Sequence, residues 1–85
     1  MDKSAAQRHS EQDVLAHVQT LVEEEHRLLG RSARTDAEHD RLARVQVELD
    51  QCWDLLRQRR ALRETGGDPD QAKVRPPEVV EKYVG

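Results

Sequence analysis

Large apolar side chains are scarce in this chain of 85 residues, which contains no phenylalanine, one tryptophan, one tyrosine and one methionine. A β-sandwich or β-barrel is not expected, because strands favour aromatic and β-branched residues. The length allows one domain, and a chain of this size buries only about 60% of the surface it exposes when unfolded. Charged residues make up 36% of the chain. This composition is typical of long, coiled-coil-like helices.

Cysteine and apolar runs are equally scarce. The single cysteine, Cys52, excludes an intrachain disulfide and argues against a zinc site built from thiolates. The net charge of -3 has the wrong sign for a general nucleic-acid binder. No apolar run approaches the roughly 20 residues that span a bilayer, and the polar start of the chain has no signal-peptide core. We therefore expect a cytoplasmic protein without a membrane segment.

An amphipathic helix is predicted over residues 10–29. Ser10 with Asp13 resembles a capping box, and Gly30 is the residue type expected just past a helix end. Residues 1–9 carry no apolar periodicity, so we expect a flexible N-terminus there. The apolar residues recur at seven-residue intervals on one helix face: Val14, Leu15, Val18, Leu21, Val22, Leu28 and Leu29.

A second helix is predicted over residues 36–65. Thr35 with Glu38 forms another capping-box pattern, and Gly66 with Gly67 marks the helix end. Its apolar residues alternate at spacings of three and four, as on a helix that packs against a neighbour: Leu42, Val45, Leu49, Cys52 and Leu56.

The C-terminal tail, residues 66–85, also carries helical signals. Asp68 is a good N-cap residue, Pro69 suits the first helical position, and Gln71 completes the capping pattern. The apolar residues that follow recur at helical spacing and are Val79, Val80, Tyr83 and Val84. We therefore expect short helical turns and a tail that packs against another surface. The pattern leaves open whether it docks on its own chain or on another.

The short link between the long helices predicts an all-α, antiparallel two-helix hairpin. A hairpin of this composition has a small core, and association of two hairpins into a four-helix bundle enlarges that core at little extra ordering cost. We therefore expect a homodimer in which Trp53, beside the apolar seam, fills the bundle. The expected dimer-core residues are Leu21, Val22, Leu28, Leu42, Val45, Leu49, Cys52, Trp53 and Leu56.

The second helix is longer than the first, so its arginine-rich end, residues 57–64, should overhang the first helix. A partner subunit, the chain's own tail or another molecule should cover this end. The arginine side chains of this end could bind the phosphate groups of nucleic acid. Cations near a helix C-terminus also complement the helix dipole, however, so nucleic acid is the less favoured partner. The residues of this candidate partner-binding surface are Leu55, Arg57, Arg59, Arg60, Leu62 and Arg63.

Glu25 interrupts the apolar face of the first helix. A buried carboxylate is costly unless it is paired, so we expect either that the bundle opens there or that Arg41, Arg44 or an arginine of a partner chain lies beside it. The alternative is a metal site, because Glu23 and His26 have the Glu-x-x-His spacing of di-iron bundles. Glu23 points away from the apolar face, however, which makes Glu23, Glu25 and His26 weak metal candidates. No bound metal or cofactor is expected.

Three stretches of the chain resemble a family of short actinobacterial proteins. They are LVEEEHRL at residues 21–28, LDQCWDLLRQRR at residues 49–60, and residues 68–76, which begin Asp-Pro-Asp and end Val-Arg-Pro. The family is uncharacterised (domain of unknown function 2630), and the resemblance covers nearly the whole chain after residue 10. It implies no activity. If its signature marks a site, the resemblance points to Glu24, Glu25, His26, Asp50, Trp53, Asp54 and Arg57.

The sequence shows no nucleophile–base constellation and no glycine-rich phosphate loop. We therefore expect a non-enzymatic helical interaction or adaptor protein that acts as a homodimer. Two alternatives stay open. One is a metal-binding carboxylate bundle, and the other is an accessory factor that binds nucleic acid or the transcription machinery through the arginine-rich end.

Overall fold

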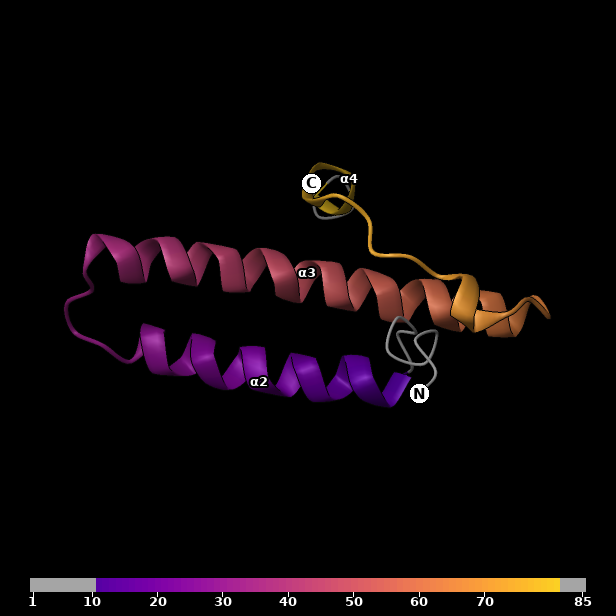
Figure 1. The fold of residues 1–85 in the computed structure, drawn as a ribbon, viewed down its shortest axis with the longest axis horizontal. Helices are drawn as coiled ribbons and strands as arrows, with labels where there is room; N and C mark the ends of the chain where they lie inside the picture. The colour runs from indigo at the N-terminus through magenta and orange to yellow at the C-terminus, as the bar shows by residue number, and fades with distance from the viewer. Residues whose placement is uncertain (1–10, 82–85) are drawn as a thin grey trace, which may run out of the picture.

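The computed structural model of the chain describes residues 11–81 and is all-α. Helix α2 (Glu11–Leu29) and helix α3 (Asp36–Glu64) lie side by side and antiparallel, and are followed by a 3-10 turn, η1 (Pro69–Gln71), and a short helix, α4 (Pro77–Glu81) (Figure 1). The predicted hairpin with a partly helical tail is confirmed. The expectations for residues 1–9, Ser10, Tyr83 and Val84 lie outside the described residues.

Both ends of α3 are fixed by local hydrogen bonds. The Glu38 amide donates to Thr35 Oγ1 at 3.1 Å, and the Thr35 amide donates to Glu38 Oε1 at 3.0 Å, which forms the expected capping box. At the other end, Gly66 has a φ of 79°, a conformation that glycine adopts without steric cost. The amides of Gly66 and Gly67 donate to carbonyls of the last helical turn, and the chain turns back along α3.

The core lies between α2 and α3. Val14, Leu21 and Leu28, spaced by seven residues, are at most 5% exposed. Val14, Val18 and Leu21 form one cluster with Val45, Leu49 and Leu55 of α3, and Leu28 and Leu42 are buried as well.

The second apolar repeat of α2 is less buried than the sequence suggested. Leu15 and Leu29 are 46% and 50% exposed, and Val22 is half-buried. Successive helical residues are about 100° apart, so this repeat is rotated toward one edge of the α2–α3 contact. The placement of both repeats on one buried face was therefore wrong for Leu15 and Leu29.

The tail docks on its own chain. Both η1 and α4 contact α3, and among the described elements neither contacts α2. Figure 1 shows α4 on the side of α3 that faces away from α2. Ala72 and Val80 are buried, so these two apolar residues of the tail contribute to the core in cis.

The capping box makes a simple test of the hairpin connection. Thr35→Ala removes the hydroxyl that accepts from the Glu38 amide, and we expect a loss of about 1 kcal/mol in the free energy of unfolding. Urea denaturation followed by circular dichroism measures it. Ser32→Ala, an exposed change in the same connection, is the control and should have little effect. Equal losses in the two variants would contradict the role of the box.

Candidate interaction surface

The chain's own tail covers Arg59 in the arginine-rich end of α3. Arg59 is 8% exposed, and its Nη1 donates to the Pro69 carbonyl at 3.2 Å and to Asp70 Oδ1 at 3.1 Å. Leu55 is 2% exposed. These two residues contact the chain itself, so they are removed from the candidate partner-binding surface. Of the three sources of cover considered from the sequence, the tail is the one observed.

Other arginines of this end are also engaged within the chain. Arg60 pairs with Glu64 one helical turn later, and Arg63 pairs with Glu11 at the start of α2. Arg57 is exposed and forms no ion pair with another described residue, while Leu62 is half-buried. Among the described residues, this end therefore does not present a continuous array of free cations.

Asp54 holds the tail against α3. Its side chain is 1% exposed, and it accepts from Arg75 Nε at 2.9 Å and from Arg75 Nη2 at 2.5 Å. Gln58 Nε2 also donates to it, at 2.8 Å. The Arg75 hydrogen bonds, assisted by that of Gln58, hold the pKa of Asp54 below its usual value despite burial. The carboxylate is therefore ionised at neutral pH.

Two glutamines extend this contact to the tail backbone. Gln51 Nε2 donates to the Arg75 carbonyl at 2.9 Å, and Gln58 Nε2 donates to the Lys73 carbonyl at 2.8 Å. Because the extended segment between η1 and α4 has few backbone partners of its own, these side chains replace them. We use the name tail latch for Gln51, Asp54, Gln58 and Arg75.

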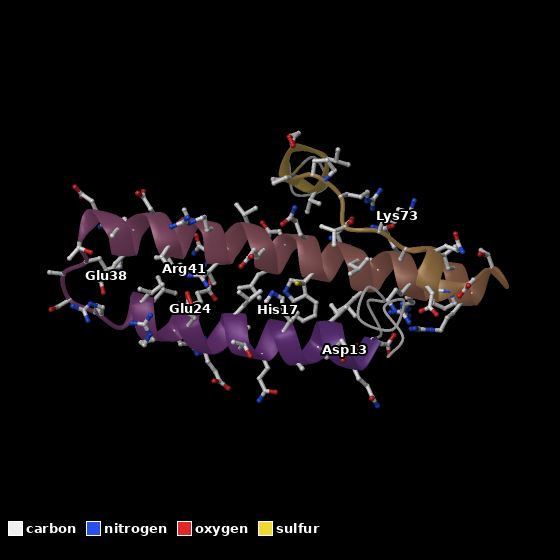
Figure 2. All side chains as sticks on the ribbon, in the orientation of Figure 1. Asp13, His17, Glu24, Glu38, Arg41 and Lys73 are labelled. Atoms are coloured by element: carbon white, nitrogen blue, oxygen red, sulfur yellow. The ribbon has the colours of Figure 1, made fainter. Side chains whose placement is uncertain are left out.

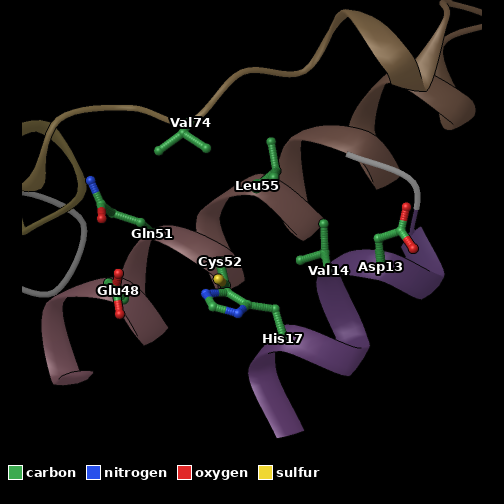
Figure 3. A pocket seen from close by; sticks show the side chains of 8 residues that line it. All are labelled: Asp13, Val14, His17, Glu48, Gln51, Cys52, Leu55 and Val74. Atoms are coloured by element: carbon green, nitrogen blue, oxygen red, sulfur yellow. The ribbon is translucent and has the colours of Figure 1, made fainter. Parts of the chain in front are cut away.

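A cavity of about 340 Å³ lies between α2, α3 and the tail (Figure 3). Its inner wall is apolar, and Asp13 and Glu48 contribute carboxylates to its lining. Burial, followed by the nearby charge of Glu48, raises the pKa of the Cys52 thiol in this wall. Cys52 is therefore protonated at neutral pH, which is unfavourable for a nucleophile because the thiolate is the reactive form.

The weak metal candidates do not converge. Glu23 and His26 are exposed, whereas Glu25 is half-buried and accepts from Gln46 Nε2 at 3.4 Å. Among the described residues, no group of three histidine, cysteine, aspartate or glutamate side chains is placed to hold a metal ion.

Arg41 was a wrong candidate for the partner of Glu25, whereas an arginine of a partner chain stays a prediction. Arg41 instead pairs with Glu24 through two hydrogen bonds, and these two side chains point toward each other in Figure 2. The hydrogen bond from Arg41 lowers the pKa of Glu24. Glu24 and Glu25 lie on opposite edges of the α2–α3 contact, and Arg41 lies on the same edge as Glu24.

The edge of the hairpin that the tail does not cover carries exposed apolar side chains. Trp53 is 45% exposed, so within one chain it lies beside the core, and its place in a dimer bundle stays a prediction. Trp53 and Val22 line a shallow groove together with Glu25, Gln46, Leu49 and Asp50. Leu15 and Leu29 follow the same seven-residue repeat as Val22 and so lie on the same edge of α2. We call Leu15, Val22, Leu29 and Trp53 the open face.

The open face separates the members of the composite suggested by the family resemblance. Asp50 and Trp53 lie on it, whereas Asp54 is buried in the tail latch. Glu25 reaches the groove, but Glu24 is engaged with Arg41 on the opposite edge. Within one chain, Glu25, Asp50 and Trp53 therefore share the groove, whereas Glu24 and Asp54 lie apart from it.

Comparison with known proteins places the chain in a family. Residues 10–85 match the family described as protein of unknown function (DUF2630). The chain belongs to the DUF2630 family. Uncharacterized proteins of Mycobacterium tuberculosis and Mycobacterium bovis are 50% identical to it over 80 residues, which are 89% of this chain and 92% of each relative. No solved structure matches the chain significantly.

In this DUF2630 protein, none of the helices within residues 11–81 combines the length and the apolar character that crossing a bilayer requires.

The tail latch predicts a specific loss of stability. Arg75→Gln leaves the buried Asp54 carboxylate with Gln58 as its remaining side-chain donor, and hydrogen bonds to charged groups contribute about 1.5–3 kcal/mol. We expect a fall of that size in the free energy of unfolding, measured by urea denaturation. Lys73→Gln, which removes an exposed cation from the same segment, should change it by less than about 0.5 kcal/mol. A similar loss in both variants would contradict the latch.

The latch also predicts acid sensitivity. Because the folded pKa of Asp54 lies below its ordinary value of 3.8, ionised Asp54 stabilises the fold above that pH, and this contribution is lost as the pH falls through the lower, folded value. In Asp54→Asn, stability should therefore depend less on pH below about 4. Thermal melts from pH 2 to pH 7 measure this, with the exposed change Asp40→Asn as control. An unchanged pH profile in Asp54→Asn would contradict the assignment.

Proposed function

We propose that this DUF2630 protein is a small, non-enzymatic interaction module that acts as a homodimer in the cytoplasm. The observation that carries the proposal is the open face. Single exposed apolar residues are ordinary on protein surfaces, but here Trp53 and Val22 line one groove, and two half-exposed leucines lie along the same edge of the hairpin. Apolar residues gathered in this way are typical of protein–protein contacts.

Composition supports the choice of a second copy as the occupant. The chain has a single tryptophan and no phenylalanine, yet Trp53 lies on the surface rather than in the core. Tryptophan is enriched among the residues that dominate binding energy at interfaces. A second hairpin on the open face would supply the apolar contacts that Trp53 lacks within its own chain, because in a two-fold dimer the same surface is buried on both subunits.

Two features support an interaction role over catalysis. Cys52 is protonated at neutral pH, and the buried Asp54 is fully engaged by its latch partners.

The single cysteine supports the proposed cytoplasmic location, because proteins of that reducing compartment rarely depend on disulfides. Arg59, Arg60 and Arg63 are neutralised within the chain, so a phosphate-binding role is not favoured.

Trp53→Ala tests the proposal. If dimerisation stabilises the fold, the melting temperature of the wild type should rise with protein concentration. The variant should dissociate about 30-fold more readily, as expected for an interface residue worth about 2 kcal/mol. Melts followed by circular dichroism over a hundredfold concentration range measure this.

The matched control is Val74→Ala. Val74 is 49% exposed, close to the value for Trp53, but it lies on the tail beside the cavity rather than on the open face. Its concentration dependence should match that of the wild type. A wild type whose melting temperature does not change with concentration would contradict the homodimer, and equal effects of the two variants would contradict the choice of face.

A further inference from the structure

The exposed edge of α3 carries a self-complementary arrangement of charges around Trp53. Asp50 precedes Trp53 by three residues, and Arg57 follows it by four, so both lie within about 60° of Trp53 around the helix. All three are exposed. Neither Asp50 nor Arg57 forms an ion pair with a residue within the described range 11–81. Along the helix axis, Trp53 thus has an acid on its N-terminal side and a base on its C-terminal side.

This order of charges has a geometric consequence for two copies of the chain. In a two-fold dimer each surface meets itself, and a residue i that contacts j is matched by j contacting i. If two α3 helices cross antiparallel with the axis beside Trp53, residue 50 of one chain lies level with residue 57 of the other. If they run parallel, residue 50 lies level with residue 50, and like charges meet.

We propose that α3 packs antiparallel against α3 of a second copy, with the two-fold axis beside Trp53, so that Asp50 of each chain pairs with Arg57 of the other. This inference rests on the proposed homodimer and specifies its register. The two tryptophans lie next to each other at the centre, and two ion pairs flank them at the rim. Such rim charges set orientation more than they add affinity.

The rest of the hairpin is compatible with this crossing. Asp54 is about 100° around the helix from Trp53 and is covered by Arg75, so the tail occupies a different side of α3. Val22 shares the groove with Trp53, and Leu15 lies one seven-residue repeat before Val22 on the same edge of α2. These apolar side chains border the crossing and would be covered with it. The tails stay docked on their own chains.

Charge reversal tests the register. Asp50→Arg places arginine opposite arginine twice in the symmetric dimer, and Arg57→Asp places aspartate opposite aspartate twice. Exposed ion pairs have small individual energies, but each change acts at two places, so we expect each variant to dimerise about tenfold more weakly than the wild type. The double variant Asp50→Arg/Arg57→Asp restores both pairs and should recover the wild-type affinity.

Mixing the two single variants tests the complementarity of the charges, and the affinities of the single variants distinguish the antiparallel from the parallel arrangement. In the mixed dimer, the two substituted positions face each other with opposite charges, and so do the unchanged Asp50 of one chain and the unchanged Arg57 of the other. Native mass spectrometry distinguishes the mixed dimer by mass, and it should exceed the statistical half of all dimers. Asp40→Arg, an exposed change on α3 that points away from Trp53, is the control and should leave dimerisation unchanged.

Each outcome of the mixing experiment supports or overturns the register. A wild-type dimer whose affinity is unaffected by the single reversals, or whose double variant stays weak, overturns the register and leaves the proposed function standing. Single reversals that leave the affinity unchanged, while the mixed dimer still exceeds one half, indicate the parallel arrangement, in which residue 50 meets residue 50, and also overturn the register. A wild type that is monomeric throughout overturns the proposed function and the register together.

Discussion

The pairing of Asp54 with Arg75 determines how the surface of this small hairpin is divided. The carboxylate is 1% exposed and is held by three hydrogen bonds, two of them from a tail residue 21 positions later. Burying a charge is costly unless it is paired and hydrogen-bonded. The tail therefore has one favourable path along α3, and it brings Ala72 and Val80 into burial on the way.

The pairing of Asp54 with Arg75 also determines which side of α3 stays uncovered. Consecutive helical residues are about 100° apart, so when Asp54 faces the tail, its neighbour Trp53 faces away from it. Helix α2 covers a third side of α3 through Val45 and Leu49. The remaining side carries Trp53 and is continued on α2 by Leu15 and Val22. A chain with few large apolar side chains thus keeps its largest one at the surface, which is consistent with association rather than with a closed monomeric core.

The sequence predicted what depends on local signals and periodicity. The capping box at Thr35, the end of α3 at Gly66 and the turn after Asp68 each rest on residues a few positions apart. The pairing of Asp54 with Arg75 and the burial of Arg59 could not be predicted, because they depend on the direction in which the tail leaves α3. Arg41 pairs with Glu24 rather than Glu25, a choice set by which edge of the interhelical contact the arginine occupies. The exposure of Trp53 has a sequence signal in retrospect, since it lies about 100° from Cys52 and so beside the seam.

Sedimentation equilibrium of the full chain tests the central claim most directly, namely that the side of α3 left open by the tail is covered by a second copy. We expect a concentration-dependent mass that approaches twice the chain mass of 9.8 kDa in the micromolar range. A mass of 9.8 kDa at every concentration up to several hundred micromolar, with the fold intact by circular dichroism, would contradict it.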